Sequence, residues 1–316
     1  MKTSVIICAY TEERWTDLLE AVKSMKNQSI ALDEIIVVID HNPHLFERTQ
    51  AHIKDIIIIE NTQQRGLSGA RNSGIKIATG DVVAFMDEDA MAEPDWIEHI
   101  LKAYDDPNVW GVGGTIEPLW EGGRPEWFPI EFNWIVGCTH SGMPNKTAPV
   151  RNLVGCNMSF RREVFDAVGG FVHGMGRIGK VPLGCEETEL CIRAKQSKPE
   201  MTILYEPAAK VLHRVPASRS TWLYFRSRCY AEGLSKAQVT QLVGAGDGLG
   251  AERSYTLKTL PLGSLKGLFD AIRGDFNGIR RSVAIILGLL ITTWGYIFGS
   301  IKQKFAQTKA LSMDSL

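Results

Sequence analysis

The sequence lacks the cysteine spacing of a zinc site or a disulfide framework. No Cys-x-x-Cys pair occurs, and the six cysteines are scattered along the chain as Cys8, Cys138, Cys156, Cys185, Cys191 and Cys229. This arrangement is typical of reduced cytosolic thiols.

The sequence also lacks an excess of basic residues. It has 35 Lys and Arg against 36 Asp and Glu, a formal net charge of -1, whereas nucleic-acid-binding domains are usually clearly basic. We therefore expect no nucleic-acid partner. There is no GxxxxGK[ST] loop, which argues against a kinase or an ATPase of that type. No secretory signal-peptide pattern follows Met1, so we expect a cytoplasmic protein.

The first 115 residues alternate between two hydrophobic patterns. Short β-branched runs predict buried parallel strands at Ser4–Cys8, Ile35–Ile39, Ile56–Ile59, Val82–Met86 and Val109–Gly113. Helical patterns fall between them, at Glu13–Asn27, Leu45–Ile53, Leu67–Thr79 and Pro94–Tyr104. Repeated strand–helix units predict an α/β fold with a doubly wound open sheet, which binds its ligands beyond the carboxyl ends of the strands.

The chain divides by composition into three parts. Residues 1–115 carry the strand–helix pattern, and residues 116–241 are richer in Trp, Pro and Gly. The Gly-rich segment 242–255 is typical of a linker. Residues 256–316 predict amphipathic and hydrophobic helices that associate with a membrane.

The C-terminal part contains one long uncharged run. Ser282–Ser300 has 19 residues without a charge, a length that can just span a bilayer. The preceding Leu257–Ile279 mixes leucines with Lys and Arg, as in a helix lying in the membrane interface. A buried core helix is the alternative for Ser282–Ser300. Basic residues flank the run on both sides, so the charge pattern gives little information on its orientation.

An acidic triplet is the strongest chemical signal. Asp87, Glu88 and Asp89 directly follow the predicted strand Val82–Met86, so their carboxylates lie where an open α/β sheet binds ligands. Acidic oxygens there suit Mg²⁺ or Mn²⁺, which would neutralise the charge on a leaving diphosphate. In isolation, such a triplet is more often a solvated turn.

A second signal is the run Gly66-Leu-Ser-Gly-Ala-Arg-Asn-Ser-Gly74. Its small residues allow a tight turn and a helix close to the sheet, although any helix start can contain them. Arg71 lies in the first turns, where a helix N-terminus favours phosphate.

Several ordered motifs together resemble family 2 glycosyltransferases of the GT-A fold. They cover roughly residues 3–236: Val5-Ile-Ile-Cys-Ala-Tyr-Thr-Glu12, Val38-Ile-Asp40, the run containing Arg71, Asp87-Glu-Asp89, Gly155-Cys-Asn-Met-Ser-Phe-Arg-Arg162 and Gly184-Cys-Glu-Glu-Thr-Glu-Leu190. Within the family, Ala231-Glu-Gly-Leu-Ser-Lys-Ala237 is similar to glucuronosyltransferases that act on glucosyl-dolichyl phosphate.

The resemblance implies that residues 1–115 form the nucleotide-sugar-binding half and residues 116–241 the acceptor-binding and catalytic half. It also implies roles for individual residues. The nucleotide sugar is expected to lie against Ala9, Thr11, Glu12, Asp40, Arg71, Asp87 and Glu88. The metal ion, Mn²⁺ or Mg²⁺, is expected at Asp87 and Asp89. His213 follows a strand-like run and is a third candidate ligand, although a single histidine in that position is more often structural.

The catalytic base of such enzymes usually belongs to a Glu-Asp pair at a helix start. This sequence has Glu186-Glu187 there, so Glu187 replaces the usual aspartate, and Glu186 and Glu189 remain alternatives. Inversion needs one carboxylate to take the proton from the acceptor hydroxyl. A solvated acidic helix start is the structural alternative.

Two further sets of residues are open to both a functional and a structural interpretation. Arg226, Arg228 and Lys236 would bind a diphosphate or a lipid phosphate, or form a solvated basic face. Trp120, Trp127 and Trp134 would stack on an acceptor sugar, or fill a small core.

The sequence therefore predicts a metal-assisted, inverting glycosyltransferase at the cytoplasmic face of the cell membrane. It would move a sugar from a nucleotide sugar, with UDP-sugars favoured, to a saccharide or lipid-linked saccharide acceptor. The alternatives are a nucleotidyltransferase that activates a sugar phosphate, which would not need Glu187, and a non-catalytic carbohydrate-binding module.

Overall fold

The computed structural model describes residues 1–177 and 183–313. Its strands are β1 (Thr3–Ala9), β2 (Glu34–Ile39), β3 (Ile57–Glu60), β4 (Val82–Asp87), β5 (Ala90–Ala92), β6 (Val109–Trp120), β7 (Ala148–Pro149), β8 (Met158–Arg161) and β9 (Thr202–Val215). The five strands predicted in the first 115 residues are confirmed, with shifts of one residue at most ends. β6 runs seven residues beyond its predicted end at Gly113.

The helices fall into two groups. Those around the sheet are α1 (Trp15–Lys26), α2 (Pro43–His52), α3 (Leu67–Ile77), α4 (Trp96–Ala103), α5 (Arg162–Val168) and α6 (Glu186–Ser197). Those of the C-terminal part are α7 (Trp222–Val243), α8 (Ala245–Gly248), α9 (Gly250–Ser254), α10 (Leu260–Ile272) and α11 (Asn277–Met313). Short 3-10 segments η1 (Glu12–Arg14), η2 (Ile130–Val136) and η3 (Ala217–Ser220), and the π-helical turn η4 (Tyr255–Thr259), complete the chain.

The strands form one mixed sheet in the order β3-β2-β1-β4-β8-β6-β9-β5, with β7 paired to β9. The first four strands in this order are parallel where they pair. Along the chain, a helix connects each of these strands to the following one, as parallel pairing requires. β8 lies antiparallel between β4 and β6. Both halves of the chain before residue 241 therefore contribute to the same sheet.

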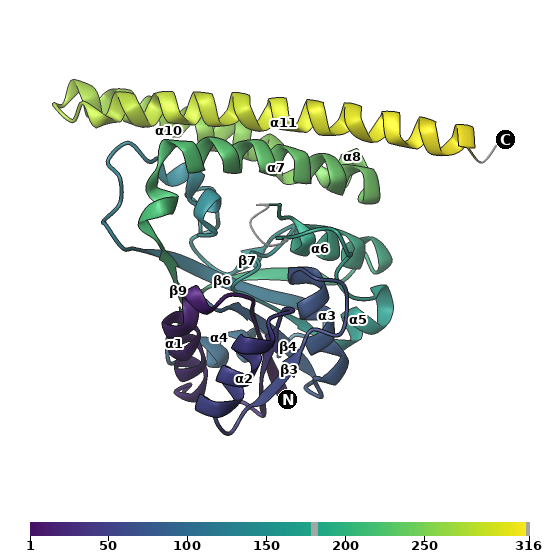
Figure 1. Cartoon of the computed structure of the whole chain (residues 1–316). Helices are drawn as coiled ribbons and strands as arrows, with labels where there is room; N and C mark the ends of the chain where they lie inside the picture. Colours follow the sequence, from purple (N-terminus) through teal and green to yellow (C-terminus); the bar gives the residue numbers. More distant parts are fainter. Residues whose placement is uncertain (178–182, 314–316) are drawn as a thin grey trace.

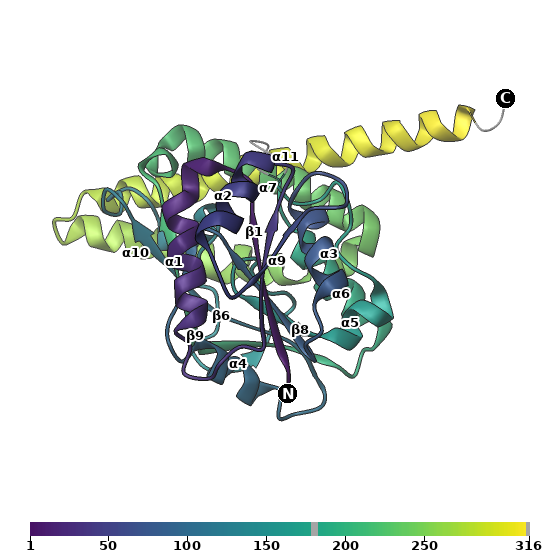
Figure 2. The same ribbon diagram turned by 60° about the horizontal axis from the view of Figure 1, so that its bottom comes forward.

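Two hydrophobic layers cover this sheet. α1, α2 and α4 pack on one face, where Leu18, Leu45 and Trp96 are fully buried, and α3, α5 and α6 pack on the other. Figure 2 shows the two sets of helices on opposite sides of β1. The first core continues upward through Phe132 and Phe225 to Ile285 of α11.

The C-terminal helices form a third layer. α11 lies alongside α7 and α10, across the top of the sheet domain (Figure 1). The predicted linker 242–255 is wrong: α7 ends at Val243, and α8 and α9 follow at once. Glu252 on α9 pairs with Arg151 and Lys236, so this segment is fastened to the rest of the fold.

Candidate functional site

One cavity of about 700 Å³ lies between the sheet and the C-terminal helices. Its floor is made by the carboxyl ends of β1 and β4, and its far wall by α7, η4 and α11. Parallel strands end at the same edge of a sheet, so the side chains that follow them meet here.

The acidic triplet lies on the floor of this cavity. Asp87 ends β4 and keeps a third of its side chain exposed (32%), whereas Glu88 and Asp89 are buried. β1 pairs in parallel with β4 so that Cys8 stands opposite Asp87. The triplet thus begins where the buried strand reaches the cavity. Because Glu88 and Asp89 are buried, it is not a solvated turn.

Two of the three predicted metal ligands, Asp87 and His213, come together, and the third, Asp89, contacts His213. His213 on β9 is aligned with Ala90 by the β5–β9 pairing, and its Nε2 lies 3.3 Å from Asp89 Oδ1. Ligand atoms of Asp87, His213 and Cys156 all lie within 4.8 Å of one another. The Asp87 carboxylate and the His213 imidazole are oxygen and nitrogen donors of the kind that hold Mn²⁺, so this cluster fits a divalent cation. Asp89 lies beside it and is also paired with Arg14 and Arg219.

Cys156 is a member of this cluster that sequence reasoning did not identify. Burial, with a smaller contribution from Asp87, raises the pKa of its thiol well above the ordinary value. A protonated thiol is a poor ligand. Burial opposes the charged form of His213, but Asp89 outweighs it and raises the pKa of His213 to about 10, so the imidazole must release a proton before it can hold a cation beside Asp87.

Two arginines beside the triplet were also missed. Arg14 Nη1 lies 3.0 Å from Glu88 Oε1 and 3.1 Å from Asp89 Oδ2, and Arg219 Nη2 lies 3.5 Å from Asp89 Oδ2. Burial raises the pKa of Glu88 to about 8 despite Arg14. The only sequence signal for Arg14 and Arg219 is their position shortly after strands whose ends reach the site.

The predicted nucleotide-binding residues divide into two groups. Ala9 and Asp40 line the cavity. The Asp40 carboxylate accepts hydrogen bonds from Asn61 Nδ2 (2.7 Å) and from the backbone N–H of Gly66 (3.0 Å), so it shapes the turn before α3. Thr11 and Glu12 are not among the cavity-lining residues: Thr11 caps η1, and Glu12 pairs with His44.

Arg71 connects the two halves of the site. It is 2% exposed, and its guanidinium lies 2.6 Å from Glu186 Oε1 and 3.4 Å from Asp87 Oδ1 while donating to the Gly155 carbonyl (3.1 Å). The alternative, that this run is an ordinary helix start, does not explain why a charged arginine is buried here. The pairs hold α3, the end of β4 and the start of α6 in one arrangement.

The three glutamates of α6 have different surroundings. Glu186 is buried and paired with Arg71, and Glu189 is buried and bound at both oxygens by Arg193. Glu187 is half-buried, lines the cavity and accepts a hydrogen bond from the Thr188 hydroxyl at 3.1 Å. Burial, with a contribution from Glu186, raises its pKa to about 8.

The basic residues and the tryptophans with two open interpretations lie in different places. Arg228 and Lys236 line the cavity, whereas Arg226 is exposed on α7. Trp120 and Trp127 pack edge-on against Phe128 and its aromatic neighbours. Of the three tryptophans, Trp134 lines the cavity.

Comparisons with known proteins agree with this architecture. The family model described as glycosyl transferase family 2 matches residues 4–169. The glucosyl-dolichyl phosphate glucuronosyltransferase of Haloferax volcanii is 35% identical over 306 residues, covering 95% of this chain and 96% of that protein. The mouse polypeptide N-acetylgalactosaminyltransferase 18 is 26% identical over 257 residues, covering 73% of this chain and 41% of that protein.

Solved structures share the fold at low sequence identity. The mannosyltransferase PcManGT from Pyrobaculum calidifontis, in complex with GDP-Man and Mn²⁺, has a TM-score of 0.62 at 17% identity, covering 93% of this chain and 87% of that one. GalNAc-T7 with UDP, GalNAc and Mn²⁺ has a TM-score of 0.54 at 18% identity, covering 81% of this chain and 54% of that one. The predicted GT-A fold is confirmed.

Proposed function

Because the chain belongs to glycosyl transferase family 2, we propose that it moves a sugar from a UDP-sugar to the hydroxyl of a lipid-linked saccharide, with inversion at the anomeric carbon. Family membership favours sugar transfer over nucleotidyl transfer and over a non-catalytic module. The Haloferax relative is named for a glucosyl-dolichyl phosphate acceptor and a glucuronosyl donor, so UDP-glucuronic acid is the first donor to test.

The observation that carries the proposal is Glu187 at the start of α6. Its carboxylate lines the cavity that also contains Asp87 and Asp89, and its pKa is about 8. A base is most effective when its pKa lies near the working pH. Glu187 would take the proton from the acceptor hydroxyl as the bond to the anomeric carbon forms and the bond to the diphosphate breaks.

Asp87, Asp89 and His213 would hold the divalent cation. When bound, it supplies positive charge for the diphosphate leaving group. The ion pairs of Arg71 fix Asp87 and Glu186 relative to each other. This arginine would therefore position the donor-binding residues relative to the catalytic base. Asp40 and Ala9 would border the nucleoside.

The C-terminal helices would bring the site to the cytoplasmic surface of a membrane. The part of α11 that includes Asn277–Phe305 is long and apolar enough to cross a bilayer by length and composition. It nevertheless packs along α7, and α10 and α11 expose apolar side chains on their outer sides: Leu262, Leu265, Phe269, Ile286, Leu290, Trp294 and Ile297. Nearby Lys258, Lys266 and Arg273 suit anionic lipid headgroups, so we favour a helix that lies on the membrane surface.

The experiment is a thermal-stability titration of the full chain with UDP, GDP, CMP and a panel of UDP-sugars, with and without Mn²⁺. A ligand that binds only the folded state raises the midpoint. Stabilisation by UDP and one UDP-sugar that requires Mn²⁺ and is lost in Asp89→Ala supports the proposal. No response to any nucleotide, with or without the metal, contradicts it.

A further inference from the structure

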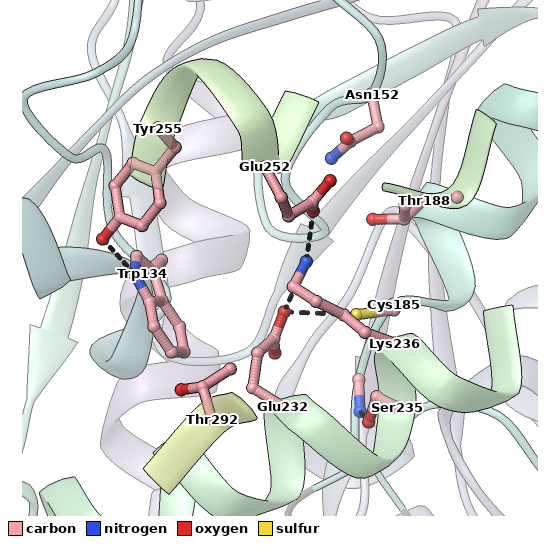
Figure 3. Close-up of polar contacts among 12 residues, drawn as sticks. Trp134, Asn152, Cys185, Thr188, Glu232, Ser235, Lys236, Glu252, Tyr255 and Thr292 are labelled. Carbon is pink, nitrogen blue, oxygen red and sulfur yellow. Dashed lines mark hydrogen bonds and ion pairs between the residues drawn. The ribbon is translucent and has the colours of Figure 1, made fainter. Parts of the chain in front are cut away.

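The part of the cavity that lies between α7, η4 and α11 has a lining of its own. Its walls come from α7 (Glu232, Lys236), from Glu252 and Tyr255 near η4, from Trp134, and from Thr292 on α11 (Figure 3). We call these six residues the α7–α11 chamber. The donor, metal and base residues discussed above lie outside it.

Charged groups occupy one side of the chamber. Lys236 Nζ lies 2.6 Å from Glu252 Oε1 and 3.3 Å from Glu232 Oε1, and Glu252 is also bound by Arg151. Burial opposes the charged form of Lys236, but the two glutamates outweigh it and raise its pKa. Burial likewise opposes ionisation of Glu252, but Lys236 and Arg151 lower its pKa to about 2. Burial also opposes ionisation of Glu232, but Lys236 and Arg228 lower its pKa, so Lys236, Glu252 and Glu232 are ionised at neutral pH.

The desolvation energy of these buried charges makes the row of ion pairs a weak source of fold stability. Apolar residues of the same size often serve a core equally well or better, because burying charges costs desolvation energy. Along the wall of a cavity, however, a row of alternating cationic donors and anionic acceptors matches the hydroxyl groups of a polar ligand.

An aromatic surface faces the same space. The indole N–H of Trp134 donates to Tyr255 Oη (2.9 Å), whose own hydroxyl donates to the Glu131 carbonyl (2.6 Å). These bonds fix the Trp134 ring beside the charged row (Figure 3). A rigid apolar plane beside charged hydrogen-bonding groups suits a sugar ring, which has C–H faces and hydroxyl edges.

The chamber is tied directly to the helix start that carries Glu187. The Cys185 thiol donates to Glu232 Oε1 (3.3 Å), and the Gly184 N–H donates to the Ser235 hydroxyl (3.1 Å). Cys185 adopts a left-handed backbone conformation (φ 71°) immediately before Glu186, a strained geometry that its surroundings must hold in place.

We infer that the α7–α11 chamber binds the acceptor's sugar unit. Lys236 and Glu252 bond its hydroxyls, Trp134 covers one ring face, and Thr292 on α11 closes the site. This inference rests on the proposed function and adds a location and a set of acceptor-binding residues. The links from α7 to Cys185 then set the distance between the bound sugar and Glu187, and α11 serves both the membrane surface and the acceptor.

The test compares Lys236→Met with Lys102→Met, a matched change at an exposed position on α4. The probes are glucosyl phosphate carrying a short prenyl chain, and octyl β-glucoside. Losing one charge-assisted contact is expected to raise the KM for both acceptors about 10- to 100-fold. Stabilisation by donor nucleotide with Mn²⁺, and slow hydrolysis of the donor by water, should stay at the wild-type level, as should every property of Lys102→Met.

Trp134→Leu provides a second, independent test. Unlike Lys236→Met, it leaves no buried charge unpaired, so it can be used if Lys236→Met fails to fold. It should raise the acceptor KM and leave donor binding unchanged. If either folded variant keeps the wild-type acceptor KM, or loses donor binding in parallel, the inference is overturned. A rise for the prenyl phosphate alone would assign the chamber to the phosphate and contradict sugar binding. If the wild-type chain fails to bind any nucleotide, it is the proposed function that fails.

Discussion

Glu187 differs from Glu186 and Glu189 in what its carboxylate contacts. The other two are paired with arginines, Arg71 and Arg193, whereas the Glu187 carboxylate accepts a hydrogen bond from the Thr188 hydroxyl. We predict that Glu187→Gln lowers kcat about 10²- to 10⁴-fold and leaves nucleotide-dependent stabilisation intact. Glu200→Gln, at an exposed position, is the control and should match the wild type. Full activity in Glu187→Gln would exclude this residue as the base.

The raised pKa of Glu187 predicts a pH dependence of the rate. The base must be ionised, and its pKa is about 8, so kcat/KM for the donor should rise as the pH increases through about 8 and fall below it. A pH–rate profile over pH 5.5–9.5 measures this. A profile that is flat between pH 6 and 9 would contradict the assignment.

The same shift affects stability with a defined sign. The folded-state pKa of Glu187 lies above the ordinary value of 4.5. Its contribution to stability is therefore fully present below about pH 4.5 and is lost as the pH rises through about 8. We therefore predict that Glu187→Gln melts at a higher temperature than the wild type at pH 8.5, with a smaller difference at pH 5. Equal melting temperatures at both values would show that the carboxylate is not destabilised by burial.

At the residue scale, the sequence predicted the members of the site better than their contacts. Asp87, Asp89 and His213 were predicted because they follow strand-like runs of an open sheet. The structure places Asp87 near His213 and His213 beside Asp89, and their role as metal ligands stays a prediction. Arg14 and Cys156 were missed, since nothing in the local sequence distinguishes a residue that reaches the cavity by meeting a distant strand. Thr11 and Glu12 were assigned through the resemblance alone, and neither lines the cavity.

At the element scale, close contact between α7 and α11 depends on glycine. A Cβ at Gly233 would lie 2.2 Å from the Thr292 carbonyl oxygen, and one at Gly295 would lie 2.4 Å from that of Tyr230. We predict that Gly233→Ala lowers stability by about 1–3 kcal/mol, because the helix backbones must separate. Gly250→Ala, where nothing lies within 4 Å of the added Cβ, is the control. Unchanged melting of Gly233→Ala would mean that the two helices are not packed in this way.

Element prediction was most accurate where strands and helices alternate locally. The five N-terminal strands follow from their β-branched runs. Apart from the edge strand β3, whose Ile57 is exposed, these runs are largely buried on both faces. Segment 242–255 was predicted to be a linker because glycine usually disfavours helix. Here the ion pairs of Glu252 and the packing of Tyr255 on Trp134 and Phe132 outweigh that preference. Such long-range contacts cannot be read from a window of sequence.

At the scale of the whole molecule, the question is how α11 meets the membrane. A helix that packs along α7 should keep both of its ends on the same side of a bilayer. We predict that Arg273→Cys and Lys302→Cys, both exposed and flanking the apolar stretch, react with an impermeant maleimide when the protein is bound to the outside of sealed anionic vesicles. The native cysteines are buried, so the wild-type chain is the background control. Protection of one position until the vesicles are opened would indicate a spanning helix.

The most direct test of the central claim is the stereochemistry of a single transfer reaction. The full chain is incubated with Mn²⁺, UDP-glucuronic acid, whose sugar is α-linked, and glucosyl phosphate carrying a short prenyl chain, and the new linkage is examined by proton NMR. The account predicts a β-linked product that forms with the wild type and falls about 10²- to 10⁴-fold with Glu187→Gln. An α-linked product, or a β-linked product formed equally well by Glu187→Gln, would contradict it.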